Sequence, residues 1–182
     1  GVYPFLQILL YPPMSSVFTC LFVGRFQPFH NGHLMVIKGM TKVCGRIVVA
    51  VGSTDKHGTA DNPFTAEERR DMIQAALQDA DIIPNFDVDF VEVPDTADDA
   101  AWTKKCLELA GEVHVVWSGN EHVLKCFKDA GKEVKQIKPV PGISATEVRA
   151  RMKAGGDWRA LVPAAVAEKI SSSNGVERVK NA

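Results

Sequence analysis

Val17-Phe18-Thr19-Cys20-Leu21-Phe22-Val23 is a mostly apolar run, and Gly24-Arg25-Phe26-Gln27-Pro28-Phe29-His30-Asn31-Gly32-His33 follows it directly. The apolar run predicts a buried strand, and the pattern that begins at His33 predicts a helix. The chain therefore leaves the carboxyl edge of a sheet through a segment that carries two histidines. Gly32 allows the backbone to approach a ligand closely, and the free N–H groups of the helix start attract anions. We interpret this segment as a phosphate-binding turn in which His30 and His33 donate hydrogen bonds to phosphate oxygens.

Apolar runs alternate with amphipathic stretches along the rest of the chain. Further strands are expected at residues 46–51, 88–93, 113–117 and 134–137, and helices at residues 33–43, 66–78, 98–110, 121–130 and 164–170. This alternation predicts an α/β fold, a Rossmann-like doubly wound parallel sheet with a short helical C-terminal region. The polar tail from Ser171 is expected to fray. Ligands of such sheets bind beyond the carboxyl ends of the strands, near the switch in strand order.

Composition sets limits on what the protein binds. The 182 residues are 46% hydrophobic and 24% charged, with a formal net charge of −1. These values predict one globular domain, residues 14–182, with no general attraction for nucleic acid or membranes. The four cysteines at positions 20, 44, 106 and 126 form no C-x-x-C pair. We therefore expect buried thiols rather than a zinc site, in a reducing compartment such as the cytoplasm.

Residues 1–13 form an apolar N-terminal extension. The segment has no basic start and no small-residue cleavage site, so it is a poor signal peptide, and it is too short to span a bilayer. We interpret it as an extension without a role in chemistry. The alternative is an apolar arm that packs on a neighbouring subunit.

A second segment, Ile143-Ser144-Ala145-Thr146-Glu147-Val148-Arg149, predicts another anion-binding helix start. Ser144 and Glu147 have the spacing of a capping box, as do Thr65 and Glu68. The Ser144 hydroxyl, Thr146 and the free amides of the first turn would surround one point. The side chain of Arg149, a little over one turn later, can reach back toward it.

Three further places have side chains suited to a nucleotide. Gly52-Ser53 follows the second expected strand, and Ser118-Gly119-Asn120 follows the fourth. Both are small polar turns at the edge where ligands bind. Trp102 can pack in the core or stack on a flat heterocycle, which contributes roughly 0.5–1.5 kcal/mol beyond area burial. A metal site at His30 and His33 competes with the phosphate interpretation, but no Asp, Glu or Cys nearby in sequence offers a third ligand.

The two phosphate-binding segments together resemble the nucleotidylyltransferase superfamily, which carries H-x-G-H and I-S-x-T-x-x-R motifs. More narrowly, the chain resembles the archaeal type of nicotinamide-nucleotide adenylyltransferase. The resemblance runs roughly from Val17 to Lys180, and its supporting pieces are Gly52-Ser53, Asn62-Pro63-Phe64-Thr65 with Glu68-Arg69, Trp117-Ser118-Gly119-Asn120, Gly156-Asp157-Trp158-Arg159 and Asn174-Gly175-Val176-Glu177-Arg178. No G-x-G-x-x-G, P-loop or G-x-S-x-G motif points to a dehydrogenase, a P-loop ATPase or a hydrolase.

The resemblance implies that ATP and NMN react to form NAD and pyrophosphate, with nicotinate mononucleotide as a possible second substrate. It implies Mg²⁺ held mainly by the ATP phosphates, no metal ligands from the protein, and a homo-oligomer. The implied catalytic residues are His30, His33, Arg25 and Arg149. The implied ATP contacts are Gly24, Arg25, Phe26, Gln27, His30, Gly32, His33, Asn120, Ile143, Ser144, Thr146 and Arg149, and the implied NMN contacts are Gly52, Ser53 and Trp102.

The chain departs from the family pattern at three places. Asp61 stands where relatives often carry a basic residue, Asp98-Asp99 stand where an Asn is common, and Glu121 replaces a frequent Pro. These changes leave the choice between NMN and nicotinate mononucleotide open. Two other functions also stay open: pantetheine-phosphate adenylyl or cytidylyl transfer by the same superfamily, and a non-catalytic nucleotide sensor.

Overall fold

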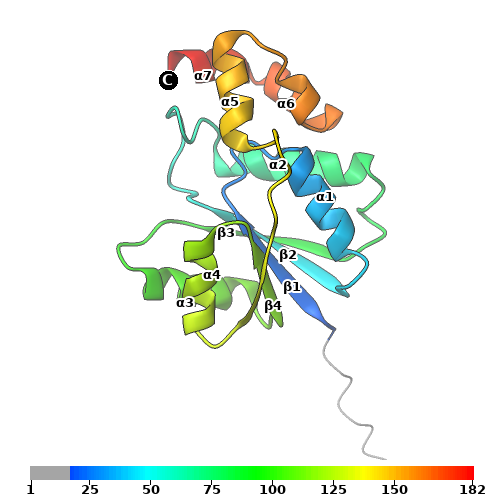
Figure 1. The fold of residues 1–182 in the computed structure, drawn as a ribbon, viewed down its shortest axis with the longest axis vertical. Coiled ribbons are helices and arrows are strands. Elements are labelled where there is room, and N and C mark those ends of the chain that lie inside the picture. Colours follow the sequence, from blue (N-terminus) through cyan, green and yellow to red (C-terminus); the bar gives the residue numbers. More distant parts are fainter. Residues whose placement is uncertain (1–16) are drawn as a thin grey trace, which may run out of the picture.

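The computed structural model describes residues 17–182, so the interpretation of residues 1–13 lies outside the described residues. A sheet of five parallel strands forms the centre, in the order β3-β2-β1-β4-β5 (Figure 1). Its strands are β1 (Thr19–Gly24), β2 (Arg46–Gly52), β3 (Val88–Val93), β4 (Val115–Ser118) and β5 (Glu133–Gln136). The helices are α1 (Asn31–Met40), α2 (Ala66–Asp79), α3 (Asp99–Ala110), α4 (Glu121–Asp129), α5 (Ala145–Ala154), the 3-10 helix η1 (Arg159–Leu161), α6 (Ala164–Ser172) and α7 (Gly175–Asn181). The expected Rossmann-like fold is confirmed.

The apolar strands build two cores because alternate side chains point to opposite faces of the sheet. Phe22 and Val49 face the helices α1 and α2, together with the C-terminal helices. Leu21 and Val48 face α3 and α4, where Phe127 is fully buried. A sheet covered on both faces explains why the strand at residues 46–51 reads as a continuous apolar run.

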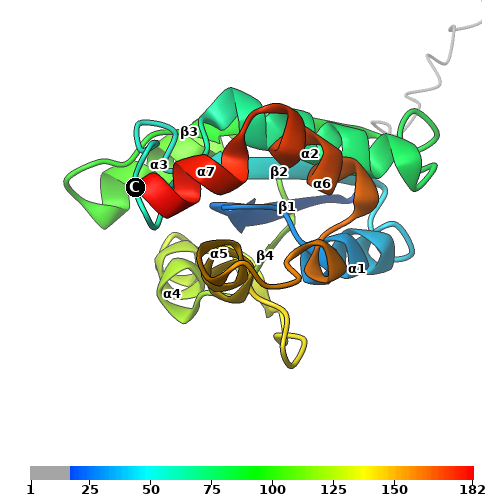
Figure 2. The same cartoon turned by 90° about the horizontal axis from the view of Figure 1, so that it is seen from above.

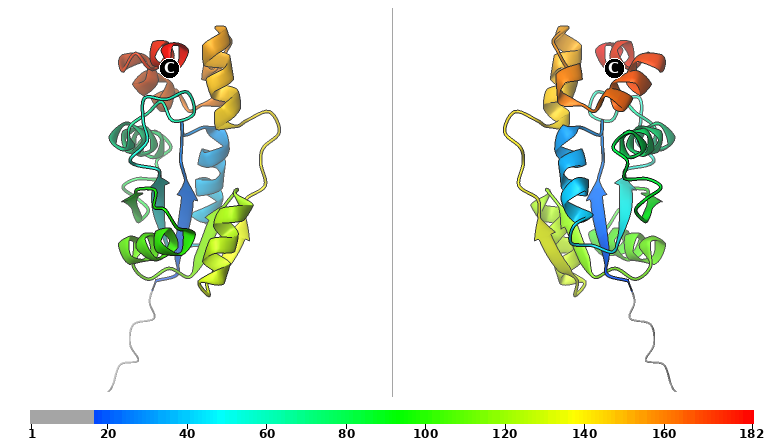
Figure 3. Two further views of the ribbon diagram at one scale, coloured as in Figure 1. Left: turned by 90° about the vertical axis from the view of Figure 1, so that its left-hand side faces the viewer. Right: turned by 90° about the vertical axis from the view of Figure 1, so that its right-hand side faces the viewer.

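The strand order reverses at β1, which pairs with β2 on one side and with β4 on the other. The chain segments that follow β1 and β4 therefore leave the sheet on either side of the switch point, where open α/β sheets bind their ligands. Helices α5, α6 and α7 lie beyond the end of the sheet to which β1 points (Figure 3). Seen from that end, α6 packs beside α2 (Figure 2).

The C-terminal region is more ordered than expected. The tail from Ser171 continues helix α6 to Ser172 and then forms α7. Val179 of α7 is fully buried in the larger core. Arg178 holds the helix in place through an ion pair with Glu68 of α2 and a 2.8 Å hydrogen bond to the Pro63 carbonyl. A mostly polar sequence gives no sign of the apolar contact of Val179 or of the Arg178–Glu68 ion pair. These contacts offset the conformational entropy that the tail loses when it becomes ordered.

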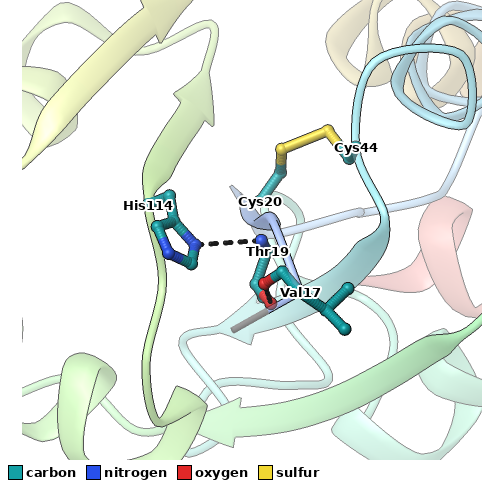
Figure 4. Close-up of a disulfide and its surroundings, with 5 residues drawn as sticks. All are labelled: Val17, Thr19, Cys20, Cys44 and His114. Carbon is teal, nitrogen blue, oxygen red and sulfur yellow. Dashed lines mark hydrogen bonds between the residues drawn. A yellow bond between two sulfur atoms is a disulfide. The ribbon is translucent and has the colours of Figure 1, made fainter. Parts of the chain in front are cut away.

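The expectation of four thiols is wrong for two of the cysteines. Cys20 on β1 and Cys44, after α1, form a disulfide whose Cα atoms lie 6.1 Å apart (Figure 4). This separation lies within the range that a disulfide bridges, and both residues are buried. The two positions are 24 residues apart in sequence. They come together because α1 returns the chain alongside β1, and no local sequence pattern predicts this contact.

The helix starts agree with expectation at one site and only in half at the other. At α2 both hydrogen bonds of the capping box form between Thr65 and Glu68. At α5 the Ser144 hydroxyl accepts from the Glu147 amide at 3.0 Å, but the Glu147 carboxylate does not return to Ser144. Instead it pairs with Arg151, one turn along, at 3.0 Å. Among residues 17–182, no helix is long and apolar enough to cross a membrane.

Candidate active site

A cavity of about 530 Å³ opens at the switch point and is lined by residues from both sides of it. Of the sequence-predicted site residues, those in its lining are Gly24, Arg25, His30, Gly32, His33, Gly52, Ser53, Trp102, Asn120, Ile143 and Ser144. The H-x-G-H segment and the start of α5 are more than a hundred residues apart in sequence, yet both contribute to this one wall. The volume lies within the range of small-molecule sites.

His30 and His33 form the cap of helix α1. The Nδ1 atom of His30 accepts from the amides of Gly32 and His33 at 3.1 and 3.3 Å. The Nδ1 atom of His33 accepts from the His30 amide at 3.1 Å. Their rings stack with centroids 3.6 Å apart and an interplanar angle of 19°. The two imidazoles thus replace the serine and glutamate of an ordinary capping box.

This geometry fixes the protonation of both rings. Burial lowers the pKa of His30 from 6.5 to about 4. Burial, followed by the neighbouring His30, lowers the pKa of His33 well below its usual value. Both rings are therefore neutral near pH 7. A neutral imidazole that accepts at Nδ1 carries its proton on Nε2. Each ring keeps an Nε2–H donor for an oxygen in the cavity.

Gly32 is required by the rings themselves. A Cβ at this position would lie 2.9 Å from Cε1 of His30, which is closer than side chains tolerate. The glycine therefore makes room for the imidazole that caps the helix, in addition to the close backbone approach expected from sequence.

The start of α5 borders the same cavity as the histidines. Ser144 lines the cavity and is exposed. Arg149, on the buried face of the same helix, donates through Nη1 to the Gln27 carbonyl at 2.8 Å, and its Nη2 lies 3.5 Å from the Thr146 hydroxyl. Burial and then the nearby Arg25 lower the pKa of Arg149, whereas Asp61 raises it. Arg149 therefore ties α5 to the H-x-G-H segment.

Four sequence-predicted ATP contacts lie outside the cavity lining: Phe26, Gln27, Thr146 and Arg149. Phe26 and Gln27 are buried. The Gln27 side chain exchanges two hydrogen bonds with the backbone of Phe64, at 2.9 and 3.0 Å. In this structure Phe26 and Gln27 support the turn from behind.

The far side of the cavity is held by contacts between side chains. The Ser53 hydroxyl donates to Asp95 at 2.9 Å, and Lys56 forms a 2.7 Å ion pair with the same carboxylate. Burial alone would raise the pKa of Asp95, but the hydrogen bonds from Lys56 and Ser53 lower it overall. Lys56 is thus engaged by Asp95.

Trp102 and Asn120 contribute the remaining walls. The half-buried Trp102 meets Phe127 edge-on, with ring centroids 5.7 Å apart, and also lines the cavity. The core interpretation of this residue is confirmed by the Phe127 contact, while its stacking on a flat heterocycle stays a prediction for a ring that borders the cavity. Asn120 caps α4 by accepting from the amides of His122 and Val123, so its side-chain oxygen is already engaged.

Arg69 belongs to the family resemblance, but the sequence assigned it no role in the site. Its side chain is fully buried and donates to the carbonyls of Arg25, Gly52 and Ser53 at 2.7, 2.6 and 3.1 Å. Burial lowers its pKa to about 10. Phe26 and Ser53, in the two turns that it joins, have φ angles of 54° and 50°. Such backbone is strained and persists only where its surroundings hold it.

A signal for Arg69 existed in the sequence. The buried positions of α2 are Arg69, Met72, Ile73, Ala76 and Leu77. This spacing is that of one helix face. An arginine in an apolar stripe must find partners inside the protein, and here the partners are the carbonyls at the ends of β1 and β2.

A parallel sheet with two cavity-lining imidazoles and a serine-capped helix start at its switch point is the arrangement that the H-x-G-H resemblance predicts for a nucleotidyltransferase. Residues 21–151 match the Cytidylyltransferase-like family. The chain is 38% identical over 162 residues to the nicotinamide-nucleotide adenylyltransferase of Methanolobus tindarius, covering 88% of this chain and 91% of the relative. It is 37% identical over 163 residues to the enzyme of the same name from Thermococcus kodakarensis, covering 88% and 86%.

Among solved structures, the fold resembles a bifunctional NMN adenylyltransferase/ADP ribose pyrophosphatase from Francisella tularensis, complexed with AMP and a Mn ion. The TM-score is 0.71 at 20% identity, and the match covers 91% of this chain and 52% of that one. At this identity the likeness shows the fold alone. The closer sequence relatives carry the assignment: the chain belongs to the nicotinamide-nucleotide adenylyltransferase family, as the resemblance of its motifs predicts.

Proposed function

We propose that this chain transfers the adenylyl group of ATP to NMN, forming NAD and pyrophosphate. The observation that carries the proposal is the convergence of His30, His33 and Ser144 on one cavity at the switch point. Membership of the family identifies the reaction, and this cavity is where we expect the triphosphate of ATP to bind.

The chemistry requires alignment and charge stabilisation more than it requires a base. A 5′-phosphate oxygen of NMN attacks the α-phosphorus of ATP in line. The bond between that phosphorus and the oxygen bridging to the β-phosphate breaks, and the electron pair leaves with pyrophosphate. The attacking phosphate is already anionic at neutral pH, so no residue needs to accept its proton. Orientation of two bound reactants can supply on the order of 7–11 kcal/mol.

The residues divide the work by position. His30 and His33 donate from Nε2 to the ATP phosphates as neutral groups, and the exposed Arg25 adds positive charge at the mouth of the cavity. Ser144 and the first-turn amides of α5 receive the same phosphates. Arg149 and Gln27 hold these two elements together, while Thr146 lies beside the Arg149 guanidinium. Preorganised donors of this kind are typically worth roughly 3–4 kcal/mol each.

Mg²⁺ fits this site only as a companion of ATP. Among the described residues that line the cavity, the carboxylates are Asp95 and Asp99, and Asp95 already forms an ion pair with Lys56. Mg²⁺ is commonly held by substrate phosphates and water with few protein ligands. When bound in this way it neutralises phosphate charge. We therefore expect the protein to contribute donors, and ATP to contribute the ligands of the metal.

The opposite side of the cavity suits the mononucleotide. Gly52 and Ser53 offer the turn after β2, and Trp102 offers an aromatic face. The Asp95 carboxylate, although paired with Lys56, lines this side and adds no free positive group for a ligand carboxylate. This arrangement favours the uncharged amide of NMN over the carboxylate of nicotinate mononucleotide.

A coupled assay tests the proposal. The chain is mixed with ATP, Mg²⁺ and NMN, and NAD and pyrophosphate are both measured. Parallel reactions contain nicotinate mononucleotide or 4′-phosphopantetheine in place of NMN, and CTP in place of ATP. We expect the highest kcat/KM with ATP and NMN. Faster turnover of phosphopantetheine or CTP would assign the chain to another transfer reaction, and nucleotide binding without product would make it a sensor.

We further infer that the chain acts as a homo-oligomer, with a single domain over residues 14–182. Because disulfides are rare in reducing compartments, the Cys20–Cys44 bond removes the argument for the cytoplasm that rested on free thiols, and that localisation stays a prediction from sequence. Val17, Phe18 and Val43 expose 58%, 44% and 60% of their surface. They lie close together because the Gly45 amide donates to the Phe18 carbonyl at 2.8 Å. Apolar side chains gathered in this way favour an interface between copies. Light scattering of the full chain tests this, and a monomer at micromolar concentration would oppose it.

A further inference from the structure

Three side chains with different ligand atoms meet between α3 and α4, at the edge of the cavity. His122 Nε2 lies 2.9 Å from a carboxylate oxygen of Asp99 and 3.9 Å from Sγ of Cys126. The three ligand atoms all lie within 4.8 Å of one another. Asp99 and His122 are exposed, and Cys126 is half-buried.

The helices place these atoms for one common centre. His122 and Cys126 are four residues apart on α4, so they share one face of that helix. Asp99 begins α3, which packs beside α4. Ligand atoms around a tetrahedral zinc lie about 3.3–3.7 Å apart, as follows from metal–ligand distances of about 2.0–2.3 Å. The two measured distances, 2.9 and 3.9 Å, lie just below and just above this range, so the ligand atoms need to shift only slightly to surround one ion.

We propose that Asp99, His122 and Cys126 bind one Zn²⁺ ion, with water in the fourth position. A thiolate and an imidazole select a borderline-soft metal such as Zn²⁺ over Mg²⁺, which prefers oxygen ligands. The site differs from the phosphate end of the cavity in its ligands and in its metal. The proposal departs from the expectation of no zinc site, which rested on the lack of a C-x-x-C pair.

The bound metal would link two helix starts that border the nucleotide cavity. Asp98, the residue before Asp99, caps α3. Asn120, two positions before His122, caps α4. Trp102 lies one turn beyond Asp99 on α3. Without metal, the Asp99–His122 contact is an exposed polar contact, and such contacts contribute little to stability. A metal that requires folded geometry stabilises the folded state by mass action.

Cobalt(II) provides a direct test because a cysteine thiolate bound to it gives a near-ultraviolet charge-transfer band. The full chain is dialysed against EDTA, freed of chelator and titrated with Co²⁺ under argon, without nucleotide. No reductant is added, so that the Cys20–Cys44 disulfide stays intact. All four cysteines lie within the described residues, and the remaining one, Cys106, is fully buried. A thiolate band therefore reports on Cys126.

We expect one equivalent of Co²⁺ to produce the band, one equivalent of Zn²⁺ to remove it, and excess Mg²⁺ to leave it unchanged. Cys126→Ser should abolish the band, and Asp99→Asn should weaken Co²⁺ binding by at least about tenfold. Asp129→Asn, an exposed carboxylate on the same helix, is the matched control and should bind like the wild type. Zn²⁺ should also raise the Tm of the wild type and not that of Cys126→Ser.

Absence of a thiolate band in the wild type, or equal Co²⁺ affinity in Cys126→Ser, would overturn the site and leave an exposed polar contact only. The measurement uses no substrate. Its failure is therefore distinct from a failure of the proposed adenylyl transfer, which the coupled assay reports.

Discussion

The two ends of the cavity are built in different ways. At the phosphate end, His30, His33 and Arg149 bond to backbone amides and carbonyls, and burial suppresses the charge of both imidazoles. At the mononucleotide end, the buried Ser53 and the exposed Lys56 each bond to the Asp95 carboxylate through their side chains. A site that must align a triphosphate gains from rigid donors, whereas a site that chooses a base can be altered one side chain at a time.

The largest expected effect is at His33, because its Nε2–H is aimed at developing charge. His33→Asn keeps a side-chain acceptor for the His30 amide but removes the imidazole donor. We expect kcat to fall by about a hundredfold or more, with little change in Tm. Lys38→Ala, an exposed change on the same helix, is the control for α1. Near-normal turnover of His33→Asn would remove this ring from the mechanism.

The buried state of His30 gives the phosphate end a pH dependence in stability. In the unfolded chain His30 becomes protonated as the pH falls below 6.5, whereas in the folded chain it stays neutral until about pH 4. The free energy of unfolding should therefore fall as the pH drops from about 6.5 to about 4, by up to about 3 kcal/mol from this residue.

The variant His30→Asn isolates that contribution, since Asn can cap the helix but does not titrate. Chemical denaturation of both proteins at several pH values gives the difference. The stability lost between pH 6.5 and 4 should be smaller in the variant. Parallel pH profiles would show that His30 already titrates normally in the folded chain.

The same contrast explains how much the sequence could reveal. Two local motifs carry the residues of the phosphate end, and a parallel sheet brings the chain after β1 to the switch point. His30, Gly32 and Ser144 could therefore be assigned to the site from the sequence. The alternation of apolar runs and amphipathic stretches also predicted the succession of strands and helices along the chain. Side chains that turn inward, such as Gln27 and Phe26, could not be distinguished from cavity-facing ones, because a loop has no fixed face.

Long-range contacts were beyond the sequence. The Cys20–Cys44 disulfide, the Arg178–Glu68 ion pair and the Ser53–Asp95 bond each join separate elements. Their formation depends on how layers pack and not on spacing along the chain. The cluster of Asp99, His122 and Cys126 corresponds to no sequence motif for the same reason. Asp99 belongs to α3, whereas the other two residues belong to α4.

Arg69 connects the two ends, so its loss should alter both. Arg69→Met fills the same space but leaves the carbonyls of Arg25, Gly52 and Ser53 without their donor. Unsatisfied buried groups cost roughly 1–3 kcal/mol. We expect a lower Tm and a fall of about tenfold in kcat/KM for NMN. Arg70→Met, on the exposed side of α2, is the matched control. If both variants kept wild-type kinetics, the strained turns would not depend on Arg69.

The smallest effect is expected at Trp102, where the ring serves packing and recognition together. Trp102→Leu keeps apolar contact with Phe127 but removes the aromatic face, so the KM for NMN should rise about three- to tenfold, as stacking of roughly 0.5–1.5 kcal/mol implies. Trp102→Phe should recover part of this affinity. The KM for ATP should stay within about twofold in both variants, because the phosphate end is held by backbone contacts that do not involve α3. A parallel rise of both KM values would instead mean that Trp102 supports the whole cavity, and the division between a rigid phosphate end and an adjustable mononucleotide end would have to be abandoned.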